Sequence, residues 1–219
     1  MKKILCINGS MRPRGNSACM LRHFEAGAGI HEPFIEQVLP HELDLKYCTG
    51  CLRCNLLKTC SQKGDDWEKL SRKILAADVL VFATPIYFHH LPSPIKKMID
   101  RFRSFVHVRI TETGLEHTPL EEWNKDFVLL LCMGSSDESE AGPVIELFRF
   151  MTNMLGQGNR LHVIKATRLA VNNQLEKTRE ELESLYEKLE LPLYLAERDC
   201  IRNRSILAAC SGLGETLSL

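Results

Sequence analysis

The architecture of this 219-residue chain follows from residues 4–17, which read Ile4-Leu5-Cys6-Ile7-Asn8-Gly9-Ser10-Met11-Arg12-Pro13-Arg14-Gly15-Asn16-Ser17. The four residues at the start are apolar and predict a buried strand, which Asn8-Gly9 ends. Asn16 or Ser17 can cap a helix that continues to about residue 28. A strand, a polar loop and a helix in this order predict the first unit of a parallel sheet wrapped by helices.

Apolar runs and amphipathic stretches alternate along the rest of the chain. They predict four further strands at residues 33–39, 79–83, 127–132 and 161–166, and four further helices at 67–77, from 94 onward, at 143–155 and at 174–196. Five strands with right-handed crossovers predict an α/β fold with a doubly wound parallel sheet in the order 2-1-3-4-5. In that order the loops at residues 9–17 and 84–90 meet at the carboxyl edge of the sheet.

One domain is expected to cover residues 1–198, with a cysteine-rich insertion at about 46–66 after the second strand and a carboxyl-terminal extension at 199–219. The last predicted helix places Leu182, Leu185, Tyr186 and Leu189 on one face. Such an apolar stripe indicates packing in the core or in a dimer.

Charge and cysteine content exclude several classes of partner and location. Lys plus Arg and Asp plus Glu both number 28, and no basic block indicates nucleic acid or a membrane as a partner. The first apolar run is too short for a secretion signal, and no stretch reaches membrane-spanning length. Nine cysteines, an odd number, argue against a complete disulfide framework and favour reduced thiols in a cytoplasmic location.

The first loop has the chemistry of an anion site. A helix amino terminus offers free N–H groups and a partial positive charge, and Ser10, Arg12, Asn16 and Ser17 can complete a cradle for a monophosphate. The loop lacks the Gly-Lys-Ser/Thr ending of nucleoside triphosphatases and the three-glycine dinucleotide fingerprint. An ordinary strand-to-helix turn, which uses the same residue types, is the alternative interpretation.

The second loop contains Pro85-Ile86-Tyr87-Phe88. Rigid backbone and flat apolar side chains suit a tricyclic ring that needs one apolar face and main-chain hydrogen bonds. Packing of the same side chains in the protein core is the alternative. The adjacent His89 and His90 are assigned no role, because neighbouring loop histidines are more often solvated than catalytic.

Four cysteines lie within thirteen residues: Cys48, Cys51, Cys54 and Cys60. Soft thiolate ligands on a short irregular segment favour an iron-sulfur cluster or zinc over hard cations. Three interpretations are open from the spacing: a four-iron cluster, a tetrahedral zinc ion, and a metal-free loop of reduced or transiently oxidised thiols. The other five cysteines have no ligand spacing among them.

Three motifs together resemble the NAD(P)H-dependent FMN reductase family of flavodoxin-like proteins. They are Gly9-Ser10-x-Arg12-x-x-x-Asn16-Ser17, Thr84-Pro85-Ile86-Tyr87 and Lys96-x-x-Ile99-Asp100-Arg101. The resemblance spans about residues 2–170 and implies a non-covalently bound FMN. It implies phosphate contacts from Ser10, Arg12, Asn16 and Ser17, and ring contacts from Pro85, Ile86, Tyr87, Phe88, Gly134 and Ser135.

Within that family the cysteine segment resembles that of iron-sulfur flavoproteins. The resemblance implies a 4Fe-4S cluster on Cys48, Cys51, Cys54 and Cys60, and a homodimer or homotetramer. Relatives with a similar insertion followed by Asp-Asp, as at Asp65-Asp66 here, resemble flavin oxidoreductases that carry no cluster.

The expected function is FMN-dependent electron transfer between NAD(P)H or a ferredoxin-like donor and a small acceptor such as a quinone, a flavin or another oxidant. No protein nucleophile or general base is required, so no catalytic residue is predicted. Two other classes fit parts of the sequence: a non-enzymatic flavodoxin-type electron carrier, and a zinc-stabilised interaction protein.

Overall fold

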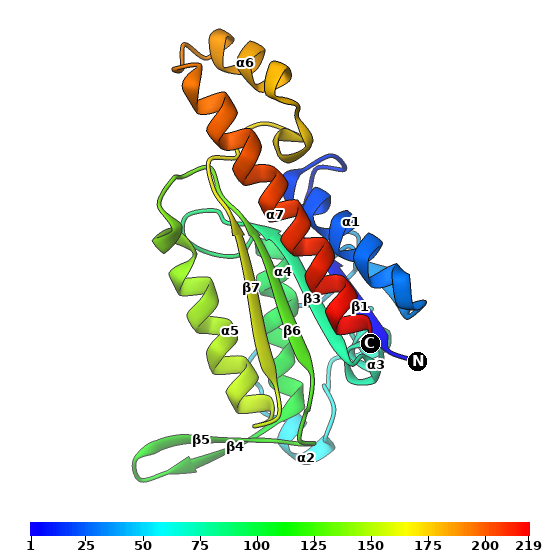
Figure 1. Ribbon diagram of the computed structural model, residues 1–219. Coiled ribbons are helices and arrows are strands. Elements are labelled where there is room, and N and C mark those ends of the chain that lie inside the picture. The colour runs from blue at the N-terminus through cyan, green and yellow to red at the C-terminus, as the bar shows by residue number, and fades with distance from the viewer.

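A computed structural model describes residues 1–219 and contains a central sheet of five strands (Figure 1). The strands are β1 (Lys3–Asn8), β2 (Phe34–Val38), β3 (Val79–Pro85), β6 (Asp126–Cys132) and β7 (Arg160–Ala166). They lie in the order β2-β1-β3-β6-β7, and every neighbouring pair is parallel. The predicted α/β class with a central five-stranded parallel sheet is therefore confirmed.

The chain has two strands that the sequence analysis did not predict. β4 (Val106–Thr111) and β5 (Gly114–Pro119) form an antiparallel hairpin outside the main sheet. In the chain, this hairpin comes before the fourth strand of the main sheet, so that strand is β6 and the fifth is β7. The predicted strand order 2-1-3-4-5 is therefore corrected to β2-β1-β3-β6-β7. The signal was the apolar–polar alternation that begins Val106-His107-Val108-Arg109, followed by a turn that ends at Gly114, where φ is 132°.

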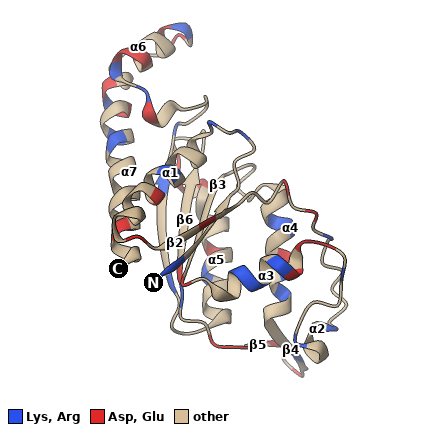
Figure 2. Cartoon of the chain, turned by 90° about the vertical axis from the view of Figure 1, so that its right-hand side faces the viewer, with Lys and Arg blue, Asp and Glu red and all other residues tan.

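Helices cover both faces of the sheet. The α-helices are α1 (Asn16–Ala28), α2 (Cys54–Leu57), α3 (Trp67–Ala76), α4 (Ser93–Arg101), α5 (Gly142–Leu155), α6 (Arg179–Lys188) and α7 (Tyr194–Ser218), and the 3-10 helices are η1 (Gly29–His31), η2 (Phe102–Phe105), η3 (Glu138–Ala141) and η4 (Gln174–Glu176). Acidic and basic residues are interspersed along α3, α6 and α7 (Figure 2). Even the longest helix, the 25-residue α7, is not apolar enough to cross a membrane, and neither is any other.

Alternating strand residues divide the interior into two cores. On β1, Ile4 and Cys6 face the core that contains α1 and α7, while Leu5 and Ile7 face the core that contains α3, α4 and α5. All four of these side chains are 2% exposed or less. Burial on both faces explains why the strands are nearly continuous apolar runs in the sequence.

The prediction of one helix at residues 174–196 is wrong. The structure has the 3-10 helix η4 and the helix α6 in that range, and α7 begins near its end. Thr178 begins α6 with a capping box, in which its side chain accepts from the Glu181 N–H and Glu181 accepts from the Thr178 N–H. Glu190 has a positive φ of 54° and Pro192 follows it, so α6 cannot continue.

The apolar stripe of α6 packs within the chain. Leu182 and Tyr186 form a small core with residues of α7, whereas Leu189 is 50% exposed. The expected boundary at residue 199 falls inside α7, whose later turns pack on α1 (Figure 1). Residues 199–218 therefore form part of a helix that covers the sheet.

Two glycines let α1 and α7 approach closely. A Cβ atom at Gly214 would lie 2.1 Å from the carbonyl oxygen of Phe24, and one at Gly27 would lie 1.9 Å from that of Ser211. Neither backbone oxygen can rotate away, so any side chain at these positions would force the helices apart.

We expect Gly214→Ala to destabilise the protein by about 1–3 kcal/mol, because the added methyl group overpacks the α1–α7 contact. Gly212→Ala is the matched control on the same helix, since a Cβ there meets no atom within 4 Å. The control should be neutral or stabilising by up to about 1 kcal/mol. Urea unfolding followed by circular dichroism measures both, and equal midpoints would contradict the close contact.

Candidate functional site

The two predicted loops meet in an open pocket of about 250 Å³ at the carboxyl edge of the sheet. Its lining comes from the loops after β1, β3, β6 and β7. The lining residues predicted from sequence are Ser10, Arg12, Asn16, Ser17, Pro85, Ile86, Tyr87 and Gly134. Eight of the ten predicted cofactor-binding residues therefore lie together around one cavity.

Hydrogen bonds within the first loop shape it around this pocket. The Ser10 hydroxyl donates to the Arg12 carbonyl at 2.7 Å and accepts from the Arg12 N–H at 3.2 Å. A Cβ at Gly15 would lie 2.3 Å from the Ser10 Oγ, so a side chain there would displace the Ser10 hydroxyl from its present position. No side chain caps the start of α1, which leaves its first N–H groups available to an anion.

Asn16 has a structural role that the sequence analysis missed. Its Nδ2 donates to the Val171 carbonyl at 2.9 Å, and its Oδ1 accepts from the Leu175 N–H at 3.2 Å. The side chain therefore holds the segment after β7 against α1, although Asn16 also lines the pocket. Arg12 reaches the same segment, since its Nη1 lies 3.4 Å from the Asn172 Oδ1.

The second loop turns sharply at the edge of the pocket. Tyr87 and His90 exchange two backbone hydrogen bonds of 3.0 Å, and the intervening Phe88 and His89 have positive φ angles of 49° and 61°. This turn points Phe88 outward, so its side chain is fully exposed and does not line the pocket. The contact of Phe88 with a bound ring therefore stays a prediction that this pocket does not support.

Ser135 is the other predicted residue outside the lining. Its hydroxyl accepts from the Asp137 N–H, and its carbonyl accepts from the Arg168 N–H. Sequence reasoning missed six lining residues, which are Gly15, Cys132, Met133, Leu169, Ala170 and Asn172. Five of them lie at or after the ends of β6 and β7, and this position at the carboxyl edge was the available signal.

The four clustered cysteines converge on one small cavity that Arg101 and Arg103 also line. The Arg101 Nη2 lies 3.3 Å from the Cys60 Sγ, and the Arg103 Nη1 lies 3.5 Å from the Cys54 Sγ. No three of the four sulfurs lie within 4.8 Å of one another. Zinc–sulfur bonds of about 2.3 Å would bring tetrahedral thiolate ligands closer together than this.

The cysteines differ in acidity. Hydrogen bonds from Ser61 and from the Arg53 backbone lower the pKa of the exposed Cys51 thiol to about 7. Burial raises the pKa of Cys54, and the nearby Arg103 opposes that effect only in part. The segment turns through positive φ angles at Gly50 and Leu52, which allows its thiols to face a common centre.

Arg101 holds the cysteine segment in place at both of its ends. Its Nη1 donates to the Lys46 carbonyl at 2.7 Å and to the Asp65 carboxylate at 2.5 Å. The side chains of Arg101 and Asp65 are 0% and 1% exposed. Burial alone would raise the pKa of Asp65, but hydrogen bonds from Arg101 and from the Lys46 N–H outweigh it and hold that pKa below its ordinary value.

The cysteine cavity and the loop pocket lie at opposite ends of α4. The helix begins at Ser93, close after the second loop, and ends at Arg101 beside Cys60. Nine residues of helix span roughly 14 Å. Within one chain, the two candidate sites are therefore separate.

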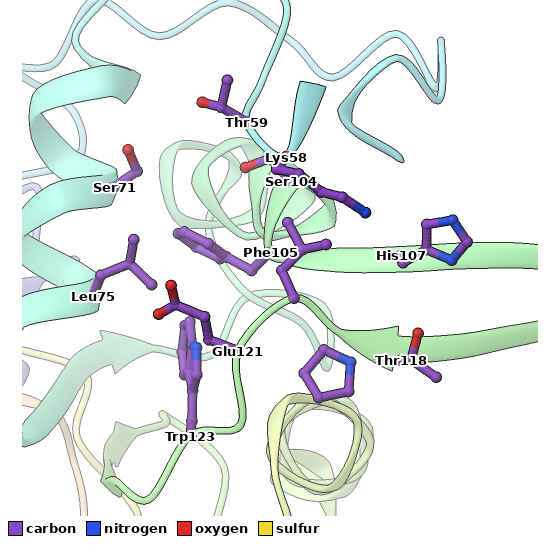
Figure 3. Close-up of a pocket in the computed structure, with 12 residues that line it drawn as sticks. Lys58, Thr59, Ser71, Leu75, Ser104, Phe105, His107, Thr118, Glu121 and Trp123 are labelled. Carbon is purple, nitrogen blue, oxygen red and sulfur yellow. The ribbon is translucent and has the colours of Figure 1, made fainter. Parts of the chain in front are cut away.

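A third and larger cavity of about 600 Å³ lies at the amino edge of the sheet (Figure 3). Trp123, Phe105 and Leu75 provide apolar lining, and Lys58 and Glu121 provide charged lining. Trp123 precedes β6 and Leu75 precedes β3, so this cavity faces away from the loop pocket. None of the predicted site residues lines it.

Comparison with known proteins identifies the family. The model of the NADPH-dependent FMN reductase family matches residues 2–176. The chain belongs to this family. Its members are oxidoreductases, so the chain is placed among flavin-dependent enzymes.

Several proteins that are similar to this chain in sequence are iron-sulfur flavoproteins. One from Methanocaldococcus jannaschii is 26% identical over 155 residues, which are 62% of this chain and 77% of the relative. Another, from Archaeoglobus fulgidus, is 39% identical over 103 residues, about half of each protein. The solved azoreductase of Bacillus anthracis shares the fold, with a TM-score of 0.65, 14% identity and coverage of 99% and 100% of the two chains.

We expect Asp65→Ala to destabilise the protein by about 3–5 kcal/mol, because it leaves the Arg101 guanidinium buried without its charge partner. Asp100→Ala is the matched control, since the Lys96–Asp100 ion pair on α4 is exposed to solvent. Loss of that pair should cost at most about 0.5 kcal/mol. Chemical unfolding of both variants measures the difference, and a cost for Asp65→Ala below about 1 kcal/mol would contradict the role of Arg101.

Proposed function

We propose that this protein uses bound FMN to move electrons between NAD(P)H or a ferredoxin-like donor and a small acceptor, such as a quinone, a flavin or another oxidant. The observation that supports this most directly is that eight sequence-predicted residues from three separate segments surround one pocket. The family match over residues 2–176 indicates the same cofactor independently.

The residues of the pocket fit the two ends of FMN. Uncapped N–H groups of α1, the Ser10 hydroxyl and the Arg12 guanidinium offer donors and positive charge for a phosphate. Ile86, Tyr87 and Leu169 offer apolar lining for a flat ring. We propose these residues, with Ser17, Pro85 and Gly134, as the flavin site.

Bound FMN would supply the redox chemistry, which accepts either a hydride or single electrons. The contribution of the chain is to hold the phosphate, orient the ring and leave a side open to a second substrate. Tyr87 is 48% exposed at the rim of the pocket, so part of the proposed ring site remains accessible. Oxidation of NAD(P)H on mixing would support the enzyme, whereas retention of FMN without such turnover would indicate a flavodoxin-type carrier.

We expect Arg12→Gln to raise the Kd for FMN about fivefold to tenfold, because it removes one charge-assisted contact from a partly exposed phosphate site. The Kd for riboflavin, which lacks the phosphate, should not change. Flavin fluorescence titration of the flavin-depleted protein measures both constants.

Arg14→Gln is the matched control for that experiment. Arg14 is an exposed arginine in the same loop, but it does not line the pocket. Its replacement should leave both constants unchanged. An Arg12→Gln variant that loses affinity for FMN and riboflavin equally would contradict the assignment of the phosphate position.

We propose further that Cys48, Cys51, Cys54 and Cys60 hold a 4Fe-4S cluster. Three observations support this: the thiols line one cavity, two arginines lie beside their sulfurs, and relatives with 26% and 39% identity are iron-sulfur flavoproteins. Thiolate ligands suit iron-sulfur clusters, and the neighbouring guanidinium groups offset their negative charge.

Anaerobic purification should yield about four irons and four sulfides per chain, with a broad visible absorption that reduction bleaches. Cys54→Ser should lose most of the iron while it retains FMN. Cys200→Ser is the control, since Cys200 is also buried but lies in the α6–α7 core. Equal iron in both variants, or no iron in the anaerobically purified wild type, would contradict the cluster.

The proposal includes a homodimer or homotetramer in the cytoplasm. The fully exposed Phe88 beside the flavin pocket is an apolar side chain that a second copy can cover. None of the nine cysteines forms a disulfide, which suits a reducing compartment.

A further inference from the structure

A separate group of metal-ligating side chains lies where α1 meets η4. Cys19 and His23 are one turn apart on α1, and Glu176 ends η4 more than 150 residues later in the chain. The thiol sulfur, an imidazole nitrogen and a carboxylate oxygen lie within 4.8 Å of one another. The His23 Nε2 and the Glu176 Oε1 lie 3.2 Å apart.

We propose that Cys19, His23 and Glu176 bind a divalent transition-metal ion of the zinc type. One sulfur, one nitrogen and one oxygen ligand form a donor set that zinc accepts. Bonds of about 2.0–2.3 Å place tetrahedral ligand atoms roughly 3.3–3.8 Å apart. The present spacing therefore needs only a small contraction, on the order of 1 Å, to close around an ion.

The burial of the three side chains leaves one coordination position open. Cys19 is fully buried, whereas the side chains of His23 and Glu176 are 37% and 30% exposed. An ion held there contacts solvent on one side, and a water molecule completes its coordination. Binding releases the thiol proton of Cys19, so metal uptake weakens as the pH falls.

Arg22 is the group that competes with the ion. Its Nη2 donates to both Glu176 oxygens, at 3.1 and 3.0 Å. The Arg22 side chain is 46% exposed and can move into solvent when the carboxylate turns one oxygen toward a metal. Thiolate and carboxylate together carry two negative charges, so a divalent ion with Arg22 nearby leaves only one excess positive charge.

The site would fasten the segment that forms one wall of the loop pocket. Leu169, Ala170 and Asn172 line that pocket, and the same segment leads directly to Glu176. Asn16 already ties this segment to α1 through Val171 and Leu175. A metal ion adds a second link on the same helix, one turn beyond Asn16.

The test compares zinc binding by the full-length wild type with that of two single variants. Each protein is dialysed against buffered Zn²⁺, and the bound zinc per chain is measured by elemental analysis. We expect His23→Gln and Cys19→Ser to bind one equivalent less than the wild type, with at least about 100-fold weaker affinity at this site. Because the comparison is a difference, metal held by Cys48, Cys51, Cys54 and Cys60 cancels.

Matched controls separate ligation from general damage. His31→Gln replaces another exposed histidine, and Cys210→Ser replaces a buried thiol in the same core as Cys19. Both controls should keep the wild-type zinc content. His23→Gln retains a hydrogen-bonding group at an exposed position, so it remains informative if Cys19→Ser does not fold. Equal zinc in the wild type, His23→Gln and His31→Gln would overturn the site.

Discussion

The buried ion pair between Arg101 and Asp65 is the interaction on which the arrangement of the two candidate sites depends. A guanidinium group that is 0% exposed needs a charge partner, because an unpaired buried charge costs several kcal/mol. That partner is Asp65, at the end of the cysteine segment. Arg101 also donates to the carbonyl of Lys46, at the start of the same segment. An otherwise irregular segment is thereby fixed to the end of α4.

The opposite end of α4 lies close to the proposed flavin pocket, so one short helix relates the two sites. Any electron transfer between the two sites within one chain must therefore cross the length of this helix. In a single chain, the four clustered cysteines and the loops of the proposed flavin pocket line different cavities. The cysteine segment also lies against the β4–β5 hairpin, where Asn55 exchanges two hydrogen bonds with the Val108 backbone.

Sequence reasoning succeeded best where local pattern and tertiary environment agree. The five sheet strands are buried on both faces, so their apolar runs were visible without any structure. Sequence reasoning does not show in which direction a loop side chain points. Phe88 is apolar and adjacent to Tyr87, but two consecutive residues with positive φ turn it toward solvent. Ser135 likewise hydrogen-bonds within its own loop.

The sequence by itself determined the α/β class, the strand-loop-helix unit at residues 4–17 and most residues of the loop pocket. These features depend on local periodicity and on the rule that parallel strands end at one edge. The tertiary structure alone revealed the double role of Asn16, the burial of Arg101 and the meeting of Cys19 and His23 with Glu176. Each of these depends on contacts between residues that lie far apart in the chain, and local sequence pattern carries no information about such contacts.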